Sequence, residues 1–544
     1  MHQEQRARRR LLAGLAAITL TAPLGLLTAG ASSAVSEAAD VAQSELGAPS
    51  RTAAAAFGTA VARDGDSTVV GAPGGTSQAG AAYVYPANGT TPTALGASDG
   101  TAGNLFGTSL AAANSQVVVG APGARAVYLY TANGTAYDQV KIDGPALDES
   151  AALQGAADDS FGDAVAFSGS QIVAGAPGAG KAYVYSPVST GGWVTTELAP
   201  SDAPTGSRFG DTVAASTARI VVGAPGAEAV YVYTPNGVGG YVETKIASPV
   251  ASSGFGTSVA TDGDRIVVGA PAAGLVFVYT PNGVGGWLES RLSTTDSDAQ
   301  FGASVGISGE RIVVGAPGVE RAYVYNPNGL GGYTQVALGA SDAKSGDAFG
   351  SAVATSNGLV VAGAPAHDHG VTDSGSAYLF DLPECAGRLA TIVGTDGDDE
   401  LRGTLGNDVI VAGDGDDVVY GGGGDDVICG GAGVDRVFGG TGNDILKGTG
   451  GNDVIRAGAG DDTVKSGPGN DRLFGGAGND QFYAGKGDDE LYGRRGNDTM
   501  RGGPGNDRLF GGQGNDVLIA GPGYDVGLGG LGKDKAISVE SFKQ

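Results

Sequence analysis

The sequence is poor in the residues that most metal and hydrolase sites require. Its 544 residues include three His, two Cys, two Met and two Trp. So few ligands leave little material for a haem, an iron–sulfur cluster, a His-rich zinc site or a Ser/His/Asp triad. Any chemistry must come from Asp, Gly and backbone groups. No catalytic constellation is visible, which predicts a protein that is not an enzyme.

Basic side chains are also scarce, with 32 Lys and Arg against 58 Asp and Glu and a formal net charge of -26 at pH 7. A polyanion would be repelled, so nucleic acid is excluded as a partner. With 41% apolar and 17% charged residues the chain is too apolar for general disorder. Its length predicts two structured domains.

Long apolar runs are confined to the N-terminus. Four Arg between Arg6 and Arg10 precede the mostly apolar run Leu11 to Leu27 and the small residues Ala29-Gly30-Ala31. This order is typical of a secretory signal peptide, here residues 1–31, followed by a linker over residues 32–40. No later stretch approaches the length of a membrane span. We expect a secreted, extracellular protein.

Two short motifs, Phe-Gly and Gly-Ala-Pro, recur at a fixed spacing through the first two thirds of the chain. Gly-Ala-Pro follows Phe-Gly by 14 residues in all seven copies, and the copies are 46 to 55 residues apart. That length is typical of one four-stranded propeller blade. We predict an all-β fold with a seven-bladed β-propeller over residues 41–382. Phe-Gly begins at Phe57, Phe106, Phe161, Phe209, Phe255, Phe301 and Phe349.

The turns and the last unit of this region carry further signals. Asn-Gly at Asn88, Asn133, Asn236, Asn282 and Asn328 predicts tight hairpin turns before the fourth strands. The seventh unit breaks at Asp381-Leu382-Pro383 before a fourth strand. We predict that residues near Val41 to Leu46 pair with Ala377 to Phe380 and close the ring, because an unpaired edge would invite aggregation.

These motifs resemble the FG-GAP repeats of the integrin α-subunit head and of glycosylphosphatidylinositol-specific phospholipase D. The resemblance implies a recognition or adhesion platform. The integrin form often carries a calcium loop, D-x-D-x-D-G, between the two motifs. Here only Asp64-Gly65-Asp66 and Asp262-Gly263-Asp264 approach that pattern. A plain hairpin is the favoured interpretation of both, and a calcium loop is the alternative.

A second periodicity follows a hinge over residues 383–393. Asp recurs every nine residues, sixteen times, always with Gly two residues before it and in fourteen copies with an apolar residue two residues after it. This pattern is the nonapeptide of a parallel β-roll. We place the roll at residues 394–537, with a tail at 538–544. The candidate metal ligands are Asp399, Asp408, Asp417, Asp426, Asp435, Asp444, Asp453, Asp462, Asp471, Asp480, Asp489, Asp498, Asp507, Asp516, Asp525 and Asp534.

The nonapeptide has a direct physical logic. Gly permits the tight left-handed turn, the carboxylate projects from that turn, and the apolar residue points into a narrow core. Two nonapeptides make one coil, so Asp399, Asp417 and Asp435 stack on one edge and Asp408 and its equivalents on the other. Stacked carboxylates repel one another, and Ca²⁺ with backbone carbonyls would remove the repulsion. The alternative is a metal-free, acidic Gly-rich linker.

The segment from Gly394 to Ile537 resembles the RTX, or haemolysin-type, calcium-binding repeats of secreted bacterial proteins. The resemblance implies calcium on the turn Asp side chains and Gly carbonyls, and folding only when calcium is present. The last two repeats depart from the pattern, with Gly527 and Ala536 at the core position. They are interpreted as a degenerate cap, which makes Asp525 and Asp534 weaker candidates.

Two smaller signals stay open. In an exported protein Cys385 and Cys429 could form a disulfide at the N-terminal end of the roll, or remain two free thiols. His367 and His369 could hold a metal, but a solvated loop is favoured.

Together the sequence predicts a secreted calcium-binding protein, with an adhesion or recognition propeller on a calcium-folded stalk. Its partners would be calcium and a cell-surface glycan or protein ligand. The alternatives are an extracellular calcium-dependent hydrolase or lyase of the propeller type, and a structural envelope protein.

Overall fold

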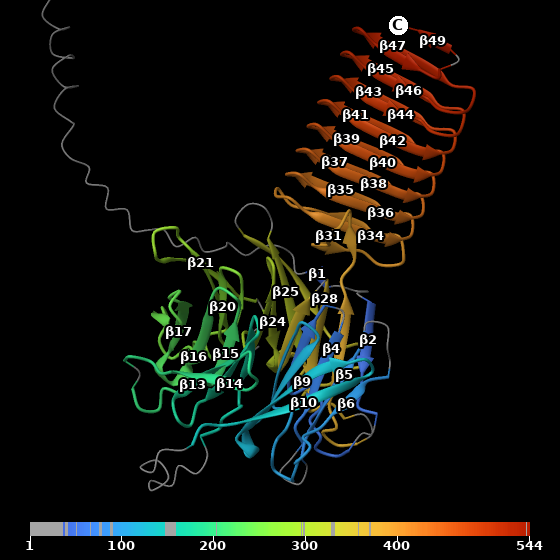
Figure 1. Ribbon diagram of the computed structural model, residues 1–544. Coiled ribbons are helices and arrows are strands. Elements are labelled where there is room, and N and C mark those ends of the chain that lie inside the picture. Colours follow the sequence, from blue (N-terminus) through green and yellow to red (C-terminus); the bar gives the residue numbers. More distant parts are fainter. Residues whose placement is uncertain are drawn as a thin grey trace, which may run out of the picture.

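The computed structural model describes residues 36–37, 42–49, 52–65, 67–74, 79–86, 91–146, 159–202, 204–294, 296, 300–327, 332–356, 358–368, 371–539 and 541–543. The predicted signal peptide, residues 1–31, lies outside them. In these ranges every element is a β-strand except three 3₁₀ turns, so the fold is all-β (Figure 1). Within the same ranges, no helix has the length and apolar character needed to span a membrane.

Seven antiparallel sheets form a β-propeller, as the repeated motifs predicted. The innermost strand of each blade packs against those of both neighbours, and blade 7 contacts blade 1. Blades 1 to 3 are β3–β6 (Val61–Asp64, Ser67–Ala72, Ala81–Tyr85, Thr93–Leu95), β7–β10 (Ser109–Ala113, Gln116–Ala121, Ala126–Asn133, Ala136–Asp143) and β11–β14 (Val165–Ser168, Gln171–Ala176, Lys181–Pro187, Trp193–Leu198).

The later blades repeat this order. Blades 4 to 6 are β15–β18 (Thr212–Ala215, Ile220–Ala224, Ala229–Pro235, Tyr241–Ala247), β19–β22 (Ser258–Asp262, Arg265–Ala270, Leu275–Pro281, Trp287–Leu292) and β23–β26 (Ser304–Ser308, Arg311–Ala316, Arg321–Pro327, Tyr333–Leu338). Blade 7 contains β27–β29 (Ala352–Ser356, Leu359–Ala364, Ser376–Asp381). The 3₁₀ turns η1–η3 (Pro122–Ala124, Pro225–Ala227, Pro317–Val319) start at the Pro of Gly-Ala-Pro.

The N-terminal segment closes the ring, as predicted. Strand β2 (Ala42–Leu46) pairs antiparallel with β29, from Ala42 opposite Asp381 to Leu46 opposite Ala377. It supplies the fourth strand that blade 7 lacks. Within the predicted linker, β1 (Ser36–Glu37) adds a parallel strand beside β26.

The two motifs recur together because they meet at the junctions between blades. All seven Phe side chains of Phe-Gly are fully buried. Phe106, for example, packs between the strands of blades 1 and 2. A Cβ built on Gly71 would lie 2.1 Å from the carbonyl oxygen of Gly107 in the next blade, so no larger residue fits there. The same contact joins Gly363 to Gly58 across the closure, at 1.9 Å.

The Asn-Gly turns differ from the prediction. Among the Asn-Gly turns that the structure describes, the one in blade 2 has a two-residue loop, between Asn133 and Ala136. In blades 4 and 5 the loops Asn236–Gly240 and Asn282–Gly286 contain five residues. Asn236 Oδ1 accepts hydrogen bonds from the amides of Val238 and Gly240, both at 3.0 Å, so the Asn side chain holds a wider loop. Asn88 and Asn328 lie outside the described residues.

The C-terminal region is a parallel β-roll of two nine-stranded sheets with a register of 18 residues, Ile392 opposite Ile410. The strands of the two sheets run from Ile392 to Lys543. One sheet contains β32 (Ile392–Val393), β34 (Val409–Asp414), β36 (Val427–Ala432), β38 (Ile445–Gly450), β40 (Thr463–Pro468), β42 (Gln481–Lys486), β44 (Thr499–Arg501), β46 (Val517–Ile519) and β48 (Lys535–Ile537).

The opposite sheet is built in the same way. It contains β33 (Glu400–Arg402), β35 (Val418–Gly423), β37 (Arg436–Thr441), β39 (Val454–Ala459), β41 (Arg472–Ala477), β43 (Glu490–Arg495), β45 (Arg508–Gln513), β47 (Val526–Leu531) and β49 (Ser541–Lys543). The apolar residue two positions after each Asp points inward, and from Ile410 to Leu518 these side chains are fully buried. They form the narrow core that the periodicity predicted.

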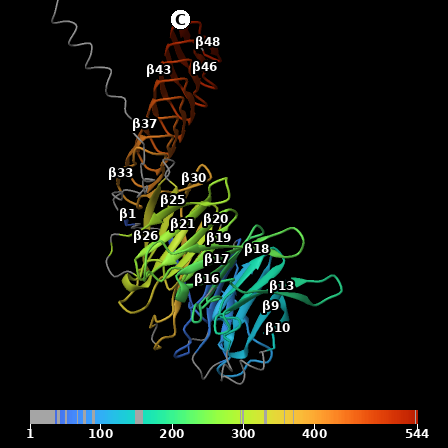
Figure 2. The same ribbon diagram turned by 90° about the vertical axis from the view of Figure 1, so that its left-hand side faces the viewer.

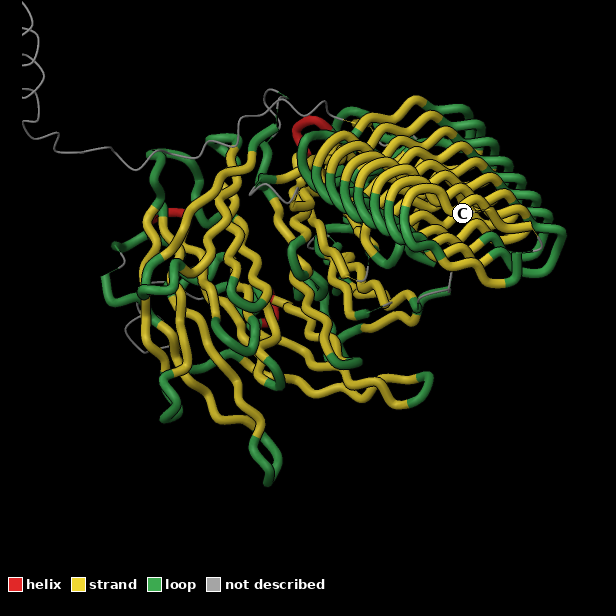
Figure 3. Tube along the Cα trace, turned by 90° about the horizontal axis from the view of Figure 1, so that it is seen from above, coloured by secondary structure: helices red, strands yellow, loops and turns green. Residues whose placement is uncertain are grey.

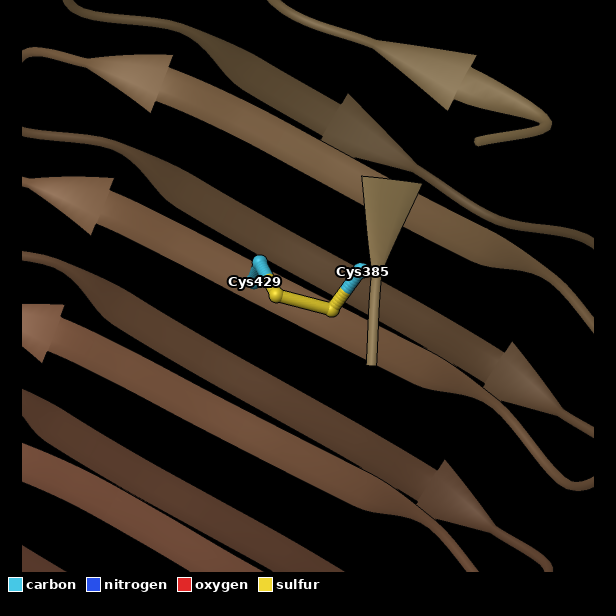
Figure 4. The surroundings of a disulfide bond; sticks show 2 residues. All are labelled: Cys385 and Cys429. Atoms are coloured by element: carbon cyan, nitrogen blue, oxygen red, sulfur yellow. A yellow bond between two sulfur atoms is a disulfide. The ribbon is translucent and has the colours of Figure 1, made fainter. Parts of the chain in front are cut away.

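The roll rises from the side of the propeller formed by blades 6 and 7 (Figures 1 and 2). Seen from above, its coils project over one side of the ring of blades (Figure 3). A hairpin, β30 (Glu384–Cys385) and β31 (Arg388–Leu389), joins the two parts. Cys385 forms a disulfide with Cys429 on β36, with the two Cα atoms 5.8 Å apart (Figure 4). Of the two alternatives, the disulfide is the one found.

Candidate calcium-binding turns

In twelve of the sixteen repeats, the turn is shaped by two glycines ahead of its Asp. Before Asp417, Gly413 and Gly415 have φ values of +116° and +119°, a region that favours Gly. A Cβ on Gly431, one coil later, would lie 1.6 Å from the carbonyl oxygen of Gly413. The glycines therefore allow both the left-handed turn and the close stacking of successive turns.

The repeated aspartates form two ladders, one on each edge of the roll. From Asp399 to Asp516, the backbone N–H of each Asp donates a hydrogen bond to Oδ1 of the Asp 18 residues later, at 2.8–3.1 Å. Asp399, Asp417 and Asp435 therefore share one edge and Asp408, Asp426 and Asp444 the other, as the 18-residue coil predicted. Oδ1 is satisfied by protein at each of these steps.

The second carboxylate oxygen has no such partner. Oδ2 is buried and makes no hydrogen bond at Asp417, Asp426, Asp435, Asp444, Asp453, Asp462, Asp471, Asp480, Asp489, Asp498, Asp507, Asp516 and Asp534. A buried acceptor without a partner is costly, and a charged one more so. A row of thirteen such oxygens therefore fits a positively charged ligand.

Backbone oxygens converge on the same places. A Cβ built on Gly421 would lie 2.5 Å from Asp426 Oδ2 and 2.5 Å from the carbonyl oxygen of Gly439. At Gly511 the corresponding distances, to Asp516 Oδ2 and the Gly529 carbonyl oxygen, are 2.3 and 2.5 Å. The residue five positions before every Asp is Gly, Ala or Ser. Where this residue is Gly, a carboxylate oxygen and a carbonyl oxygen thus lie beside the space that its missing side chain leaves open.

The electrostatics of the turns favour a bound cation. Burial raises the pKa of Asp426 to about 8, and Asp444 and Asp408 add to the rise against the hydrogen bond from the Asp408 amide. Burial likewise raises the pKa to about 7 at Asp453, Asp462, Asp489 and Asp498. Without a counter-ion, ionising these carboxylates is therefore unfavourable.

The donor set fits calcium. Among the described residues there is no cluster of three or more His, Cys, Asp or Glu side chains that could hold a metal. The turns offer one carboxylate each together with backbone carbonyls. All-oxygen ligation with flexible geometry suits Ca²⁺ better than Mg²⁺, which demands near-ideal octahedra, or zinc, which prefers nitrogen and sulfur.

The two ends of the ladder differ from the middle. At the start, Asp399 Oδ2 accepts hydrogen bonds from the Thr395 amide and hydroxyl, and Asp408 Oδ2 from those of Thr404. At the end, Asp525 and Asp534 accept bonds from Asp507 and Asp516, as their equivalents do. The terminal repeats lack a large core residue but keep the stacked carboxylate.

Residues that the sequence reasoning missed form a second ladder. The residue before the Asp donates its amide to the Asn or Asp side-chain oxygen 18 residues earlier, at 2.7–3.0 Å. Asn or Asp occupies this position in thirteen of the sixteen repeats. Val434 interrupts one edge. The enrichment of Asn and Asp at this position was the sequence signal that could have predicted the second ladder.

In the propeller, the candidate metal ligands already have other roles. Asp262 and Asp264 lie in a plain hairpin, which was the favoured interpretation of the sequence. Asp262 Oδ2 accepts a hydrogen bond from the Gly309 amide of the next blade, and Asp264 forms an ion pair with Arg219 of the previous blade. Asp64 accepts from the Ser115 amide of blade 2. These carboxylates connect neighbouring blades.

His367 does not lie in a solvated loop, in contrast to the prediction. Its side chain is buried, with Nδ1 2.8 Å from Asp347 Oδ2 and the ring against Tyr378. It packs inside blade 7 because Asp347 provides a partner there. His369 lies outside the described residues.

Comparison with known structures adds only distant likenesses to the propeller. The chain is similar to virginiamycin B lyase from Staphylococcus aureus at 10% identity, with TM-score 0.47 over 63% of this chain and 100% of that one. It is similar to a streptogramin B lyase structure at 8% identity, with TM-score 0.46 over 62% and 96%. The Cps50 (Swd1) propeller domain of Myceliophteria thermophila gives 13% identity and TM-score 0.43 over 63% and 99%. Likenesses this weak carry no functional argument.

Two repeat families match the chain. The FG-GAP repeat matches residues 41–85, 92–137 and 333–380. The RTX calcium-binding nonapeptide repeat matches residues 393–428, 429–464, 466–500, 492–527 and 501–535. No curated protein sequence matches the chain. The protein therefore combines FG-GAP repeats in its N-terminal region with RTX repeats, which bind calcium, in its C-terminal region.

Proposed function

We propose that this calcium-binding protein is secreted and non-enzymatic, with the propeller as an adhesion or recognition platform and the roll as its calcium-folded stalk. The observation that carries the proposal is the row of thirteen buried, unbonded Oδ2 atoms. Calcium would be held by these aspartates, from Asp417 to Asp534, and by carbonyls such as those of Gly439 and Gly529. The scarcity of His and Cys supports a role without catalysis.

Folding of the roll would then depend on the concentration of calcium. Bound calcium would supply positive charge, with the turn oxygens as its ligands. The chain itself orients those oxygens through the Oδ1 hydrogen bonds, and its apolar core excludes water. At a free concentration ten times the dissociation constant, each site adds about 1.4 kcal/mol of stability. Several sites suffice to fold a marginal repeat array, and the high calcium outside a cell would trigger folding there.

A calcium titration of the purified full chain tests the proposal. We expect a cooperative gain in β-sheet circular dichroism and bound calcium by calorimetry. Asp462→Asn should reduce the bound calcium by about one ion per chain. Its neighbour gives a matched control: Asp461→Asn keeps the oxygen that accepts the Asn479 amide, so it should leave the number unchanged. Absence of heat and of any structural change would contradict the proposal.

A second candidate function rests on the outer face of the sheet from β33 to β49. In this acidic protein, the strands of that sheet carry seven Arg and one Lys against two Glu. All seven Arg are exposed: Arg402, Arg436, Arg456, Arg472, Arg494, Arg495 and Arg508. Such a basic strip attracts an extended anion.

Aromatic side chains hold this strip rigid. Phe474, Tyr492 and Phe510 stack with centroids 5.0 and 4.7 Å apart. The Arg456 guanidinium lies between Phe438 and Phe474, 5.4 and 5.1 Å from their centroids. Because the ring faces are covered by one another, they are not free to stack on nucleic-acid bases. An acidic cell-surface glycan is the partner that this strip favours.

Binding to immobilised dextran sulfate, with neutral dextran as reference, tests this candidate. Replacing Arg436, Arg456 and Arg472 by Gln should weaken binding about tenfold, as expected for three lost surface charges. The same change at Lys447, Lys465 and Arg501 on the opposite sheet removes equal charge and should weaken it less than about twofold. Equal losses in both variants would mean general charge attraction and would exclude a specific glycan face.

A further inference from the structure

We propose that the first coil of the roll is a metal-free nucleus, closed by Thr395 and Thr404, on which the calcium-dependent coils stack. The inference rests on the proposed calcium sites and deepens that proposal, because it assigns Asp399 and Asp408 to a structural role. Calcium sites would then begin at Asp417 on one edge and at Asp426 on the other.

The hydrogen bonds of the first two turns carry this inference. The Thr395 amide and hydroxyl donate to Asp399 Oδ2 at 2.6 and 2.9 Å. The Thr404 amide and hydroxyl donate to Asp408 Oδ2 at the same two distances. The chain itself therefore satisfies the oxygen that is left unbonded in the later turns.

The Thr hydroxyls also close the turn behind the carboxylate. Thr395 Oγ1 accepts a hydrogen bond from the Gly397 amide at 3.2 Å, and Thr404 Oγ1 accepts one from the Gly406 amide at 3.0 Å. Each hydroxyl thus acts as donor and acceptor in one small network. Charge-assisted bonds to a carboxylate are about twice as strong as neutral ones, which makes these turns self-sufficient.

Conformation, and not the presence of Thr alone, separates the two kinds of turn. Thr449 occupies the equivalent position before Asp453, but its φ is +93° and Asp453 Oδ2 is unbonded. Thr395 and Thr404 are outside that left-handed region. In the second coil Gly413 has a φ of +116°, and a Cβ there would lie 2.1 Å from the Thr395 carbonyl oxygen of the coil before. The first coil has no roll coil before it.

Covalent and polar contacts fix the base of the roll to the propeller. The Cys385–Cys429 disulfide ties the connecting hairpin to β36, which follows β32 and β34 in the same sheet. The Asn326 side chain of blade 6 donates to the Ala390 carbonyl oxygen at 3.5 Å. The Thr391 amide donates to the Val409 carbonyl oxygen at 2.7 Å. A preformed coil held in this way supplies the register for the next coil and removes the cost of nucleation from the calcium-driven step.

Calcium counting with paired variants of the full chain tests the assignment. Asp417→Asn with Asp426→Asn should lower the number of bound ions by about two. At saturating calcium, Asp399→Asn with Asp408→Asn should leave the number unchanged, because those carboxylates hold no ion. A loss of two ions from the second pair would overturn the inference. If neither pair changes the number, the proposed calcium sites themselves are wrong.

Hydrogen exchange in chelator gives an independent readout without metal. In the wild-type chain we expect residues 392–411 to remain protected, while amides from Val454 onward exchange within seconds. The Asp399→Asn, Asp408→Asn pair should abolish the protection of 392–411, which a mere surface role would not do. Equal exchange of the first coil and the later coils in the wild type would overturn the nucleus.

Discussion

The propeller and the roll are both built from short repeats that hold carboxylates away from solvent, yet they treat those carboxylates in opposite ways. In the propeller, Glu228 accepts hydrogen bonds from the amides of Ser253, Gly254 and Phe255, and Asp159 pairs with Arg125 across a blade junction. In the roll, one oxygen of each carboxylate in the middle coils stays buried without a partner. The comparison teaches that the satisfaction of buried carboxylates, and not the number of acidic residues, distinguishes the region of the calcium-binding repeats from the propeller.

The largest expected effect comes from opening the propeller while leaving the roll intact. Deleting residues 32–50 removes β2, its five-residue ladder with β29 and the buried Leu46. We expect the melting temperature of the propeller to fall by about 10 °C or more, as several kcal/mol are lost. Calorimetry should show the calcium-dependent transition of the roll unchanged. An unchanged propeller transition would mean that ring closure is not important for stability.

A pair of carboxylate substitutions sharpens the comparison. Asp453→Asn removes a charge from a turn whose Oδ2 is unbonded, so it should destabilise the roll in calcium but not in chelator. Glu228→Gln weakens hydrogen bonds that exist without metal, and should cost about 1 kcal/mol with or without calcium. Thermal melts of both variants in calcium and in chelator check this. A calcium-dependent effect at Glu228 would contradict the separation of the two regions.

The response to pH should have opposite sign in the two regions when calcium is removed. Burial raises the pKa of the roll aspartates, to about 8 at Asp426 and about 6 at Asp435, above the value of the unfolded chain. The folded roll then binds more protons, so its stability is present at about pH 4 and is lost as the pH rises through 6 to 8. Circular dichroism in chelator should show more β-structure at pH 5 than at pH 8.

The propeller supplies the contrast in the same experiment. Burial alone would raise the pKa of Asp159 and of Glu228. The hydrogen bonds from Arg125 to Asp159, and from the Ser253 hydroxyl and the backbone amides to Glu228, outweigh burial and lower both pKa values. Lowered values give stability that is present above the unfolded pKa, about 4, and is lost as the pH falls below it. If both transitions lose stability in the same direction of pH, the contrast between the carboxylates is wrong.

The smallest expected effect is a repair of the outer Asn/Asp ladder. Val434, 46% exposed, stands where an Asn or Asp would accept the amide of Asn452 in the next coil. Val434→Asn should add one hydrogen bond and stabilise the calcium-loaded roll by about 0.5 to 1 kcal/mol. Val434→Ala, which adds no acceptor, is the control. Equal melting temperatures for the two variants would show that the ladder adds no stability.

Much of the fold could be predicted because both repeats have strict spacing. The 14-residue offset reflects glycines that meet across blade junctions, and the nine-residue register reflects the coil. The missing strand of blade 7 could be predicted because Leu382 and Pro383 leave the seventh unit one strand short. Each of these features follows from a pattern that is visible in the sequence.

What could not be predicted depends on contacts between distant residues. The Asn236 loop is wide because its side chain binds two amides, and His367 is buried because Asp347 faces it. Thr395 and Thr404 stand in glycine positions of the repeat, but only the structure shows that they bond the Asp. In the roll, the stacking of the candidate aspartates was predicted correctly. The difference between the first coil and the later coils depends on hydrogen bonds that only the structure shows.

The disulfide between Cys385 and Cys429 also sets how far the protein can be stretched. A pull on the C-terminal end of the roll is transmitted to the propeller through this covalent link and not through the backbone between the two cysteines. The bypassed segment has a sequence separation of 44 residues. Fully extended it would add about 150 Å of length. Under load, the base of the stalk therefore acts as an inextensible tether, while the coils beyond Cys429 remain the part that can lengthen and absorb force.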